Sequence, residues 1–296
     1  MCIAVIVVDR DCTGLCQMIQ SKLPDVLIQQ WPHITQPELV EFAVLWQHPE
    51  GITAQFPNLK AVTSLGAGTN HLDHDKALEG LPQLRVVTDS LKQLMAQYVL
   101  LYLLSDSRHQ LGYNTQQHQK KWHVLENEVI PTVGFVGLGA LGGFVADRCS
   151  DLGFKTVAWT VQSEHPNHTC YHGKSGLKKV IEQSDYVVVL LPLKPETRHI
   201  IDATTLSWFK QEAVLINVAR GAHVDELALC SALQKNQLKH AVLDVFETEP
   251  LPKESPLWGL DNVTITPHVS ALSDAHQTAS MVVDLFNQYV FGNTKT

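Results

Sequence analysis

The chain has 296 residues, of which 45% are hydrophobic and 18% are charged. This length predicts about two domains, and this composition is typical of globular proteins and excludes a disordered or fibrous chain. The formal net charge of −8 argues against nucleic acid or an anionic membrane as the main partner, so a bound anion must be held by local backbone amides or single cations.

Strands and helices alternate along the first hundred residues. Runs rich in Val, Ile and Leu predict strands, and helical stretches fall between them at 12–22 and 72–78. The strands are expected at 2–8, 25–28, 42–45, 59–64 and 85–88. This alternation predicts a parallel sheet covered by helices. A long helix at 91–104 should lead into the second domain.

The second half of the chain has a more regular pattern. Six strands are expected, at 133–136, 157–159, 186–191, 214–217, 241–245 and 263–266, with helices near 141–152, 176–183, 203–209 and 225–235. Six strands with helical crossovers predict a doubly wound sheet. The segment 271–290 has helical spacing and should return to the first domain. We therefore expect one domain at 1–100 plus 270–296, and a second at 101–269.

A glycine motif, Gly137-Leu138-Gly139-Ala140-Leu141-Gly142, lies between a predicted strand and a predicted helix. In that context the spacing indicates a dinucleotide site. Gly137 permits the turn, Gly139 lets backbone approach a pyrophosphate, and Gly142 lets helix and strand pack closely. The N-terminus of the helix then faces the negative phosphate.

Residues with ligand-binding chemistry follow the six strands of this second domain. Ligands of open parallel sheets bind beyond the carboxyl ends of the strands, so these residues should share one edge. In strand order they are Gly137, Thr160, Pro192, Arg220, Glu249 and His268. This edge therefore combines glycines, a cation, a carboxylate and an imidazole.

Three segments resemble signatures of the D-isomer-specific 2-hydroxyacid dehydrogenases. They are Ile-Asn-Val-Ala-Arg-Gly at 216–221, Leu-Asp-Val-Phe-Glu-Thr-Glu-Pro at 243–250 and Ile-Thr-Pro-His-Val-Ser at 265–270. The similarity covers nearly the whole chain. Leu-Gly-Ala-Gly at 65–68 and Leu-Trp-Gln-His-Pro at 45–49 further resemble the glyoxylate/hydroxypyruvate reductase A type. The resemblance implies a Rossmann cofactor domain inserted into a flavodoxin-like substrate domain, both α/β and doubly wound.

The implied reaction is reduction of a small 2-oxo acid to the 2-hydroxy acid, by a hydride to carbon and a proton to oxygen. The planar guanidinium of Arg220 suits the substrate carboxylate and can polarise the carbonyl. By resemblance, His268 donates the proton, and Glu249 orients it and favours its charged form. The backbone turn at Ala67 and Gly68 is assigned to the substrate carboxylate. Trp46 either walls the substrate pocket or belongs to the core.

The cofactor is expected to be NADP(H), with NAD(H) as the alternative. An NAD-selective site has Asp or Glu after the second strand, whereas Thr160 is followed here by Val161, Gln162 and Ser163. The subgroup usually has an arginine in this turn, which Val161 is not, and Glu164 could partly replace the acid. The expected cofactor-binding residues are Gly137, Gly139, Ala140, Leu141, Gly142, Thr160, Leu191, Pro192, Thr197, Val218, Ala219 and Asp244, the last as acceptor from the nicotinamide amide.

No metal is expected. His165, His168, Cys170 and His172 are suitable zinc ligands, but they come from one short stretch without a second cluster, so an exposed polar loop is the favoured interpretation. The six cysteines form no CxxC pair, and residues 1–10 lack the features of a signal peptide, so a cytoplasmic protein with reduced thiols is expected.

The resemblance also implies a homodimer, with the segment 98–122 at its interface. Two other functions are compatible with the sequence. A 3-phosphoglycerate-type dehydrogenase would need additional cations for the phosphate. A dinucleotide-gated binding or regulatory protein on the same fold would bind the cofactor without turnover.

Overall fold

The computed structural model describes residues 1–8, 10–126 and 130–292. The chain divides into two compact units, Met1–Leu91 with Ser273–Thr296, and Lys92–Leu272. We refer to them as unit 1 and unit 2. From the sequence we expected the boundaries at 100 and 270. In the structure, the first boundary between the units follows Leu91, near the start of the long helix α2 (Asp89–Ser107).

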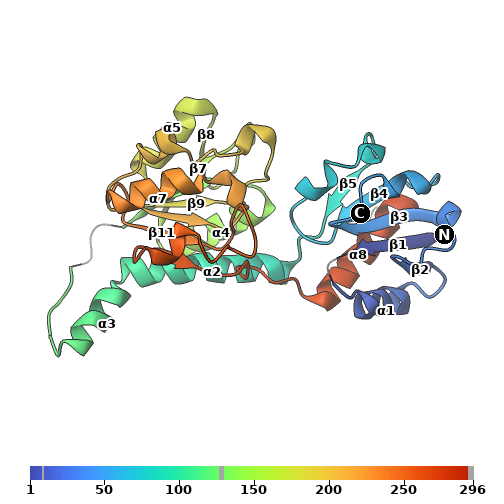
Figure 1. Ribbon diagram of the computed structural model, residues 1–296, viewed down its shortest axis with the longest axis horizontal. Coiled ribbons are helices and arrows are strands. Elements are labelled where there is room, and N and C mark those ends of the chain that lie inside the picture. The colour runs from blue at the N-terminus through green and yellow to red at the C-terminus, as the bar shows by residue number, and fades with distance from the viewer. Residues whose placement is uncertain (9, 127–129, 293–296) are drawn as a thin grey trace. The chain divides into compact units, whose positions relative to one another are not determined.

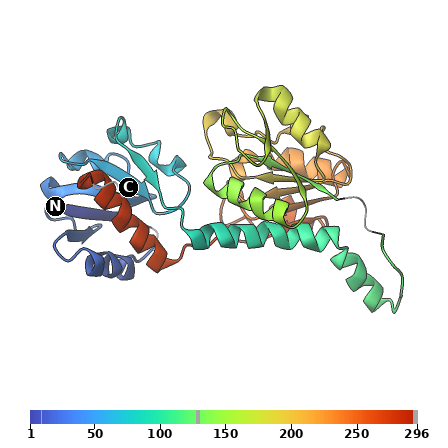
Figure 2. The same ribbon diagram turned by 180° about the vertical axis from the view of Figure 1, so that it is seen from behind.

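Unit 1 contains a five-stranded parallel sheet in the order β2-β1-β3-β4-β5. This is the flavodoxin-like order expected from the sequence. The strands are β1 (Cys2–Val7), β2 (Leu27–Gln30), β3 (Val40–Trp46), β4 (Ala61–Ser64) and β5 (Gln83–Arg85). The helix α1 (Thr13–Lys22) lies beside the C-terminal helix α8 (Ala275–Val290) on one face of the sheet (Figure 2).

Both faces of this sheet are buried, which explains the continuous apolar run of β1. On one face Ile3, Val5 and Phe42 pack against Val282 and Phe286 of α8. The other face packs against the short 3-10 turns η2 (Ile52–Gln55), η3 (Asn70–Leu72) and η4 (Lys76–Leu78), while a further turn, η1 (Pro37–Leu39), directly precedes β3.

The prediction of a helix at 72–78 was wrong, because the two turns η3 and η4 take its place. The first turn ends at Asp73, and Asp75 caps the second turn by accepting a hydrogen bond from the amide of Ala77. The carboxylate of Asp75 also accepts the hydroxyl proton of buried Thr53 at 2.7 Å. This tertiary contact fixes a local interruption that the apolar spacing did not indicate.

Unit 2 contains a seven-stranded parallel sheet in the order β12-β11-β10-β9-β6-β7-β8. Its strands are β6 (Thr132–Val136), β7 (Lys155–Trp159), β8 (Thr169–Tyr171), β9 (Tyr186–Val189), β10 (Val214–Asn217), β11 (His240–Leu243) and β12 (Val263–Ile265). Successive strands are added on one side of β6 as far as β8 and then on its other side from β9 onward, so the switch point of this Rossmann-type sheet lies between β6 and β9. The expected pair of doubly wound α/β sheets is confirmed, with β8 as an additional edge strand.

The helices of unit 2 cover both faces of its sheet (Figure 1). They are α2, α3 (Gln110–His118), α4 (Ala140–Asp151), α5 (Gly173–Gln183), α6 (Ala203–Leu206) and α7 (Glu226–Gln234), with 3-10 turns η5 (Pro195–Thr197), η6 (Gly221–His223) and η7 (Pro256–Gly259). The sequence did not predict α3, which extends away from the sheet of its own unit (Figure 1). Among the described residues, no helix combines the length and the hydropathy needed to cross a bilayer.

Candidate active site

The glycine motif forms a tight turn between β6 and α4. Gly137 has a φ of 103°, and a Cβ there would lie 2.6 Å from the carbonyl oxygen of Leu190. A Cβ on Gly142 would lie 2.5 Å from the carbonyl oxygen of Gly137. A side chain at either position would therefore force the turn and the helix apart.

Gly139 differs from these two glycines because no atom lies within 4 Å of the position a Cβ would occupy. It is the N-cap of α4 and is exposed, and no side chain caps the helix. The first-turn amides of α4 consequently border open space. A dinucleotide pyrophosphate fits this arrangement, since it would accept those amides and be favoured by the helix dipole.

The other residues expected to bind the cofactor lie at the ends of β7, β9, β10 and β11. Leu191, Val218 and Ala219 are buried, whereas Pro192 is exposed.

The two threonines expected to bind the cofactor have hydrogen-bond partners within the protein. The hydroxyl of Thr160 donates to the carbonyl of Ser163 at 2.5 Å. The hydroxyl of Thr197 accepts from the Lys194 amide at 2.8 Å and forms the cap of η5. Both threonines thus shape their turns, and both hydroxyls already have protein partners.

Arg220, Glu249 and His268 follow β10, β11 and β12, which are neighbours in the sheet. The His268 Nδ1 and Glu249 Oε2 atoms are 2.8 Å apart. Glu249 Oε1 accepts the amide of Phe246 at 3.0 Å, which fixes the carboxylate. Glu249 also interacts electrostatically with Arg220. The structure therefore brings the three side chains together at one edge of unit 2.

The electrostatics of this cluster favour ionised partners. Burial would raise the pKa of Glu249, but the hydrogen bonds from His268 and the Phe246 amide outweigh it and lower the pKa below its ordinary value. Burial lowers the pKa of Arg220, an effect that the charge of Glu249 opposes. Arg220 nevertheless stays a cation at neutral pH, as arginines in proteins do.

Gly221 permits the loops after β10 and β11 to approach each other. A Cβ on Gly221 would lie 1.8 Å from the carbonyl carbon of Phe246. Only glycine allows this approach, which brings the segment containing Arg220 beside the segment that leads to Glu249. The glycine of the Ala-Arg-Gly segment is therefore a steric requirement of the cluster.

Asp244 organises the turn that presents His268. Its fully buried carboxylate accepts the Thr266 hydroxyl at 2.6 Å and the amides of Val269 and Ser270 at 2.8 Å each. The carbonyl of Asp244 accepts the amide of His268 at 2.8 Å. His268 itself has a φ of 54°, a conformation that is unfavourable without such support. The carboxylate has about four acceptor positions, so one remains for a further donor.

His223 was missed by the sequence interpretation. It is fully buried in η6, and its Nδ1 donates to the carbonyl of Arg220 at 3.1 Å. The same carbonyl accepts from Asn217 Nδ2 at 3.0 Å. Burial lowers the pKa of His223 to about 4, so the ring is neutral at physiological pH. The only sequence signal was the histidine three residues after Arg220.

The expected substrate residues Trp46, Ala67 and Gly68 lie in unit 1, at the carboxyl ends of β3 and β4. A Cβ on Gly66 would touch the Trp46 ring at 3.5 Å, so this turn lies against the indole. Ser64 Oγ donates to the carbonyl of Gly68 at 2.6 Å and braces the turn. Within the described part of this unit, the amides of Ala67 and Gly68 donate no hydrogen bond.

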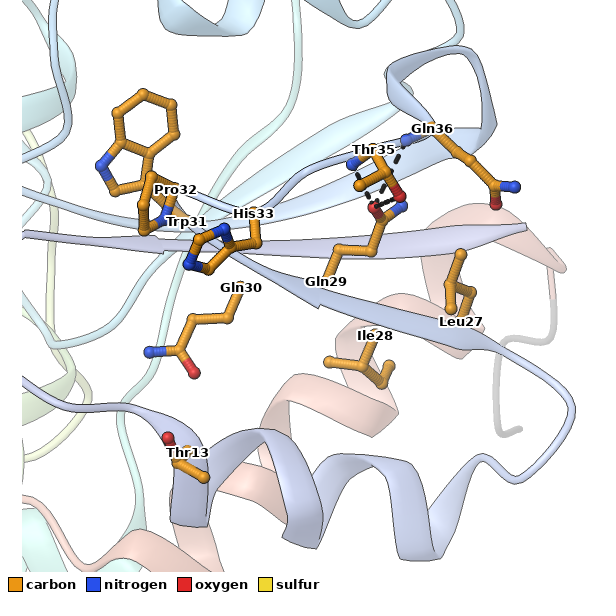
Figure 3. Close-up of a pocket in the computed structure, with 10 residues that line it drawn as sticks. All are labelled: Thr13, Leu27, Ile28, Gln29, Gln30, Trp31, Pro32, His33, Thr35 and Gln36. Carbon is orange, nitrogen blue, oxygen red and sulfur yellow. Dashed lines mark hydrogen bonds between the residues drawn. The ribbon is translucent and has the colours of Figure 1, made fainter.

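Unit 1 has a hollow of about 650 Å³ between the edge strand β2 and α1. Figure 3 shows that the residues lining it include no Asp, Glu, Lys or Arg. The side chain of Gln29, one of the glutamines that line the hollow, turns toward Thr35 and Gln36. The backbone amides of these two residues donate to Gln29 Oε1 at 2.6 and 3.3 Å. These groups satisfy each other, so nothing here indicates catalytic chemistry.

The histidine-rich loop is more ordered than the sequence suggested. It contains β8, and His168 is buried, so the expectation of an exposed loop was wrong. Asp147, His165 and His168 bring potential metal-ligand atoms within 4.8 Å of one another. The two ring nitrogens of His168 are hydrogen-bonded to Thr156 Oγ1 at 2.7 Å and to Asp147 Oδ1 at 3.0 Å. These two contacts give the buried ring a structural role beside Asp147.

Residues 100–270 match the model of the D-isomer specific 2-hydroxyacid dehydrogenase NAD binding domain. The chain belongs to this family. It is 35% identical to a glyoxylate/hydroxypyruvate reductase A from Yersinia enterocolitica, over 86% of this chain and 84% of that one. This 2-hydroxyacid dehydrogenase is accordingly an NAD(P)-dependent oxidoreductase.

Solved structures of other family members are similar to this dehydrogenase over nearly their whole length. A D-isomer specific 2-hydroxyacid dehydrogenase from Xanthobacter autotrophicus, in complex with NADPH and MES, matches with a TM-score of 0.91 and 33% identity, over 99% of this chain and 96% of that one. An NADPH-dependent glyoxylate/hydroxypyruvate reductase from Sinorhizobium meliloti, in complex with NADP and sulfate, matches with a TM-score of 0.86 and 27% identity, over 99% and 96% of the two chains.

The open space at Gly139 gives a first prediction. In Gly139→Ala the added methyl group meets no protein atom, so the Tm should stay within about 2 °C of the parent, while NADPH binding by calorimetry should weaken at least about tenfold. Gly142→Ala is the matched control, because its methyl would collide with the protein itself and lower the Tm. Undiminished NADPH affinity in Gly139→Ala would argue against a pyrophosphate at this turn.

Buried His223 gives a second prediction, on stability and pH. Its folded pKa of about 4 lies below the ordinary value of 6.5, so its contribution is complete above pH 6.5 and is lost as the pH falls toward 4. Between pH 7 and 4.5 it should remove about 2 to 3 kcal/mol from the free energy of unfolding. In His223→Gln, which does not titrate, urea unfolding should show a correspondingly smaller loss. Equal losses in both proteins would contradict the assignment.

Proposed function

We propose that this protein reduces glyoxylate, hydroxypyruvate or a similar small 2-oxo acid to the 2-hydroxy acid with NADPH. The observation that carries the proposal is the His268–Glu249 pair, 2.8 Å apart, with Arg220 in electrostatic contact at the same sheet edge as the glycine turn. The similarity to glyoxylate/hydroxypyruvate reductases supports this substrate class.

The proposed roles follow from the chemistry of each side chain. The bound nicotinamide supplies a hydride to the carbonyl carbon. Arg220 binds the substrate carboxylate and polarises the carbonyl through its N–H groups. His268 donates a proton from Nε2 to the carbonyl oxygen, because its Nδ1 is held by Glu249. The resulting imidazole is neutral and takes up a proton from solvent before the next turnover.

The substrate carboxylate has a second proposed anchor in unit 1. The amides of Ala67 and Gly68 are available as donors to it, and Trp46 forms a wall beside them.

The cofactor preference for NADP(H) rests on the turn after β7. Thr160, Val161, Gln162 and Ser163 place no carboxylate there to repel a 2′-phosphate. Glu164, the acid that follows, is paired with His172 at 2.8 Å. That pair raises the pKa of His172, which favours its cationic form. The two structural relatives bind NADPH or NADP, in keeping with this preference.

A homodimer stays a prediction, as does the cytoplasmic location. The homodimer is supported by three exposed apolar side chains on and after α3, which are Leu111, Trp122 and Val124. The Trp122 side chain is fully exposed, and exposed apolar surface is typical of protein–protein interaction sites when it forms a contiguous patch. The 3-phosphoglycerate-type dehydrogenase and the dinucleotide-gated binding protein are the other functions to be separated by experiment.

A panel of 2-oxo acids tests the proposed function directly. NADPH absorbance should fall on addition of glyoxylate or hydroxypyruvate, with kcat/KM of about 10⁴ M⁻¹ s⁻¹ or more, and NADH should be at least about tenfold less efficient. NADPH binding without turnover of any 2-oxo acid would favour the regulatory protein. Strong preference for 3-phosphohydroxypyruvate, or for NADH, would overturn the substrate or cofactor proposal respectively.

The role of Glu249 gives a further prediction. In Glu249→Gln the carboxylate that is hydrogen-bonded to His268 Nδ1 is replaced by a neutral amide, which is a weaker acceptor. The imidazole is then held less firmly, so kcat for reduction in a steady-state assay with NADPH should fall at least about tenfold. Glu247→Gln is the matched control, because Glu247 pairs with Arg198 and His199 instead. A kcat that Glu249→Gln leaves unchanged would refute the role of the carboxylate.

A further inference from the structure

A chain of hydrogen bonds joins the helix α2 to the turn that carries His268. Within unit 2, α2 packs against the sheet on the same face as α4, through buried side chains such as Val99 and Leu103 (Figure 2). Tyr98 lies on this part of the helix. Its hydroxyl oxygen is 2.5 Å from the Oγ1 atom of Thr266, which directly follows β12.

The direction of these hydrogen bonds follows from the protons available. The Thr266 hydroxyl donates to Asp244 Oδ1 at 2.6 Å. A threonine hydroxyl has only one proton, so Thr266 accepts from Tyr98 and the phenol is the donor. Burial raises the pKa of Tyr98 above its ordinary value, so the phenol keeps its proton throughout the physiological pH range. Tyr98 is therefore a permanent donor to Thr266.

The phenol and the threonine are both held in place. The Tyr98 ring packs edge-on against Tyr102, with ring centres 5.0 Å apart, and contacts the buried apolar cluster of this face. The Thr266 amide donates to the carbonyl of Leu243 at 3.0 Å, and its carbonyl accepts the amide of His268 at 3.1 Å. With the backbone of Thr266 fixed in this way, the hydroxyl is oriented by its two side-chain partners, Tyr98 and Asp244.

The orientation of the Asp244 carboxylate depends on its partners, because the terminal torsion of an aspartate has a broad range. Its Oδ1 atom accepts both the Thr266 hydroxyl and the Val269 amide, at 2.6 and 2.8 Å. Its Oδ2 atom accepts the amide of Ser270 alone among the residues that the structure describes. Each carboxylate oxygen has about two acceptor positions. Oδ1 is therefore filled, and the remaining acceptor position belongs to Oδ2.

Resting on the proposed function, we propose that Tyr98 is a positioning residue for the nicotinamide and for His268. By holding Thr266 on Oδ1, the phenol keeps Oδ2 of Asp244 as the acceptor for the carboxamide of the nicotinamide. The same carboxylate fixes the turn that carries His268. Tyr98 thus acts on both reacting groups through Thr266 and Asp244.

Calorimetric binding of two dinucleotides tests this role without turnover. NADPH has a carboxamide that donates N–H groups, whereas its reduced 3-acetylpyridine analogue has a methyl ketone in that position and cannot donate. Tyr98→Phe should weaken NADPH binding about threefold to tenfold and leave the affinity for the analogue within about twofold of wild type. A merely structural loss would weaken the binding of both. If wild type prefers NADH, the same comparison is made with NADH and its analogue.

Tyr186→Phe is the matched control. Tyr186 is a buried tyrosine of unit 2 whose hydroxyl also donates to a side chain, Asp106 Oδ2 at 2.8 Å. It lies at the start of β9, whereas Asp244 follows the end of β11, so the two groups lie at opposite edges of the parallel sheet. This variant loses the same hydroxyl group and should bind both dinucleotides as wild type does.

Variants of Thr266 test the path from the phenol to the carboxylate. Thr266→Val by itself should show the same selective loss of NADPH affinity, which keeps the role testable if Tyr98→Phe does not fold. In the Thr266→Val background, Tyr98→Phe should change NADPH affinity less than about twofold, because the connecting hydroxyl is gone. In Thr266→Ser, which keeps a hydroxyl, the effect of Tyr98→Phe should return.

The outcomes separate this role from the proposed function. Equal losses for NADPH and the analogue, additive losses in the double variant, or a loss no larger than that of Tyr186→Phe would overturn the positioning role and leave the proposed function standing. Failure of wild type to reduce any 2-oxo acid would overturn the proposed function, whereas a selective loss of NADPH binding in Tyr98→Phe would still support the role of Tyr98 toward the nicotinamide.

Discussion

The candidate active site depends on the buried carboxylate of Asp244. Its oxygens hold Thr266, Val269 and Ser270, and its carbonyl holds the amide of His268. A buried carboxylate is stable only when hydrogen-bond donors surround it, and these donors belong to the turn that carries the imidazole. The position of His268 and its positive φ therefore follow from the need to satisfy one acid at the end of β11.

Close approach of loops is the second constraint, and glycine makes it possible. Gly221 permits contact between the loops after β10 and β11, while Gly137 and Gly142 permit the tight turn before α4. At those three glycines, neighbouring backbone occupies the space where a side chain would lie. At Gly139 that space stays open, with no protein atom within 4 Å of the Cβ position. One edge of the sheet thus combines the cluster of Arg220, Glu249 and His268 with open space at the start of α4. Both properties arise from the absence of a Cβ at particular positions.

Tertiary hydrogen bonds decided most departures from the expected elements. The helix expected at 72–78 became two turns because Asp75 bonds to Thr53, far away in sequence. The histidine-rich loop gained β8 and a buried His168 because Thr156 and Asp147 satisfy that ring. His223 was missed as well, since burial of a single polar residue has no periodic signature in the sequence. Strands such as β10, by contrast, matched their expected bounds.

Sequence alone determined the fold class and the order of chemistry along the sheet edge. Apolar runs of four to six residues between helices dictate parallel strands, and the residues after each strand must then share one edge. It also fixed the glycine turn, since the spacing of Gly137, Gly139 and Gly142 has a direct steric meaning. Only the tertiary structure decided which buried polar groups find partners among residues 1–8, 10–126 and 130–292, as His168 does with Thr156 and Asp147 and as Trp46 Nε1 does not. Hydrogen-bond satisfaction depends on contacts between distant segments, and these exist only once the chain has folded.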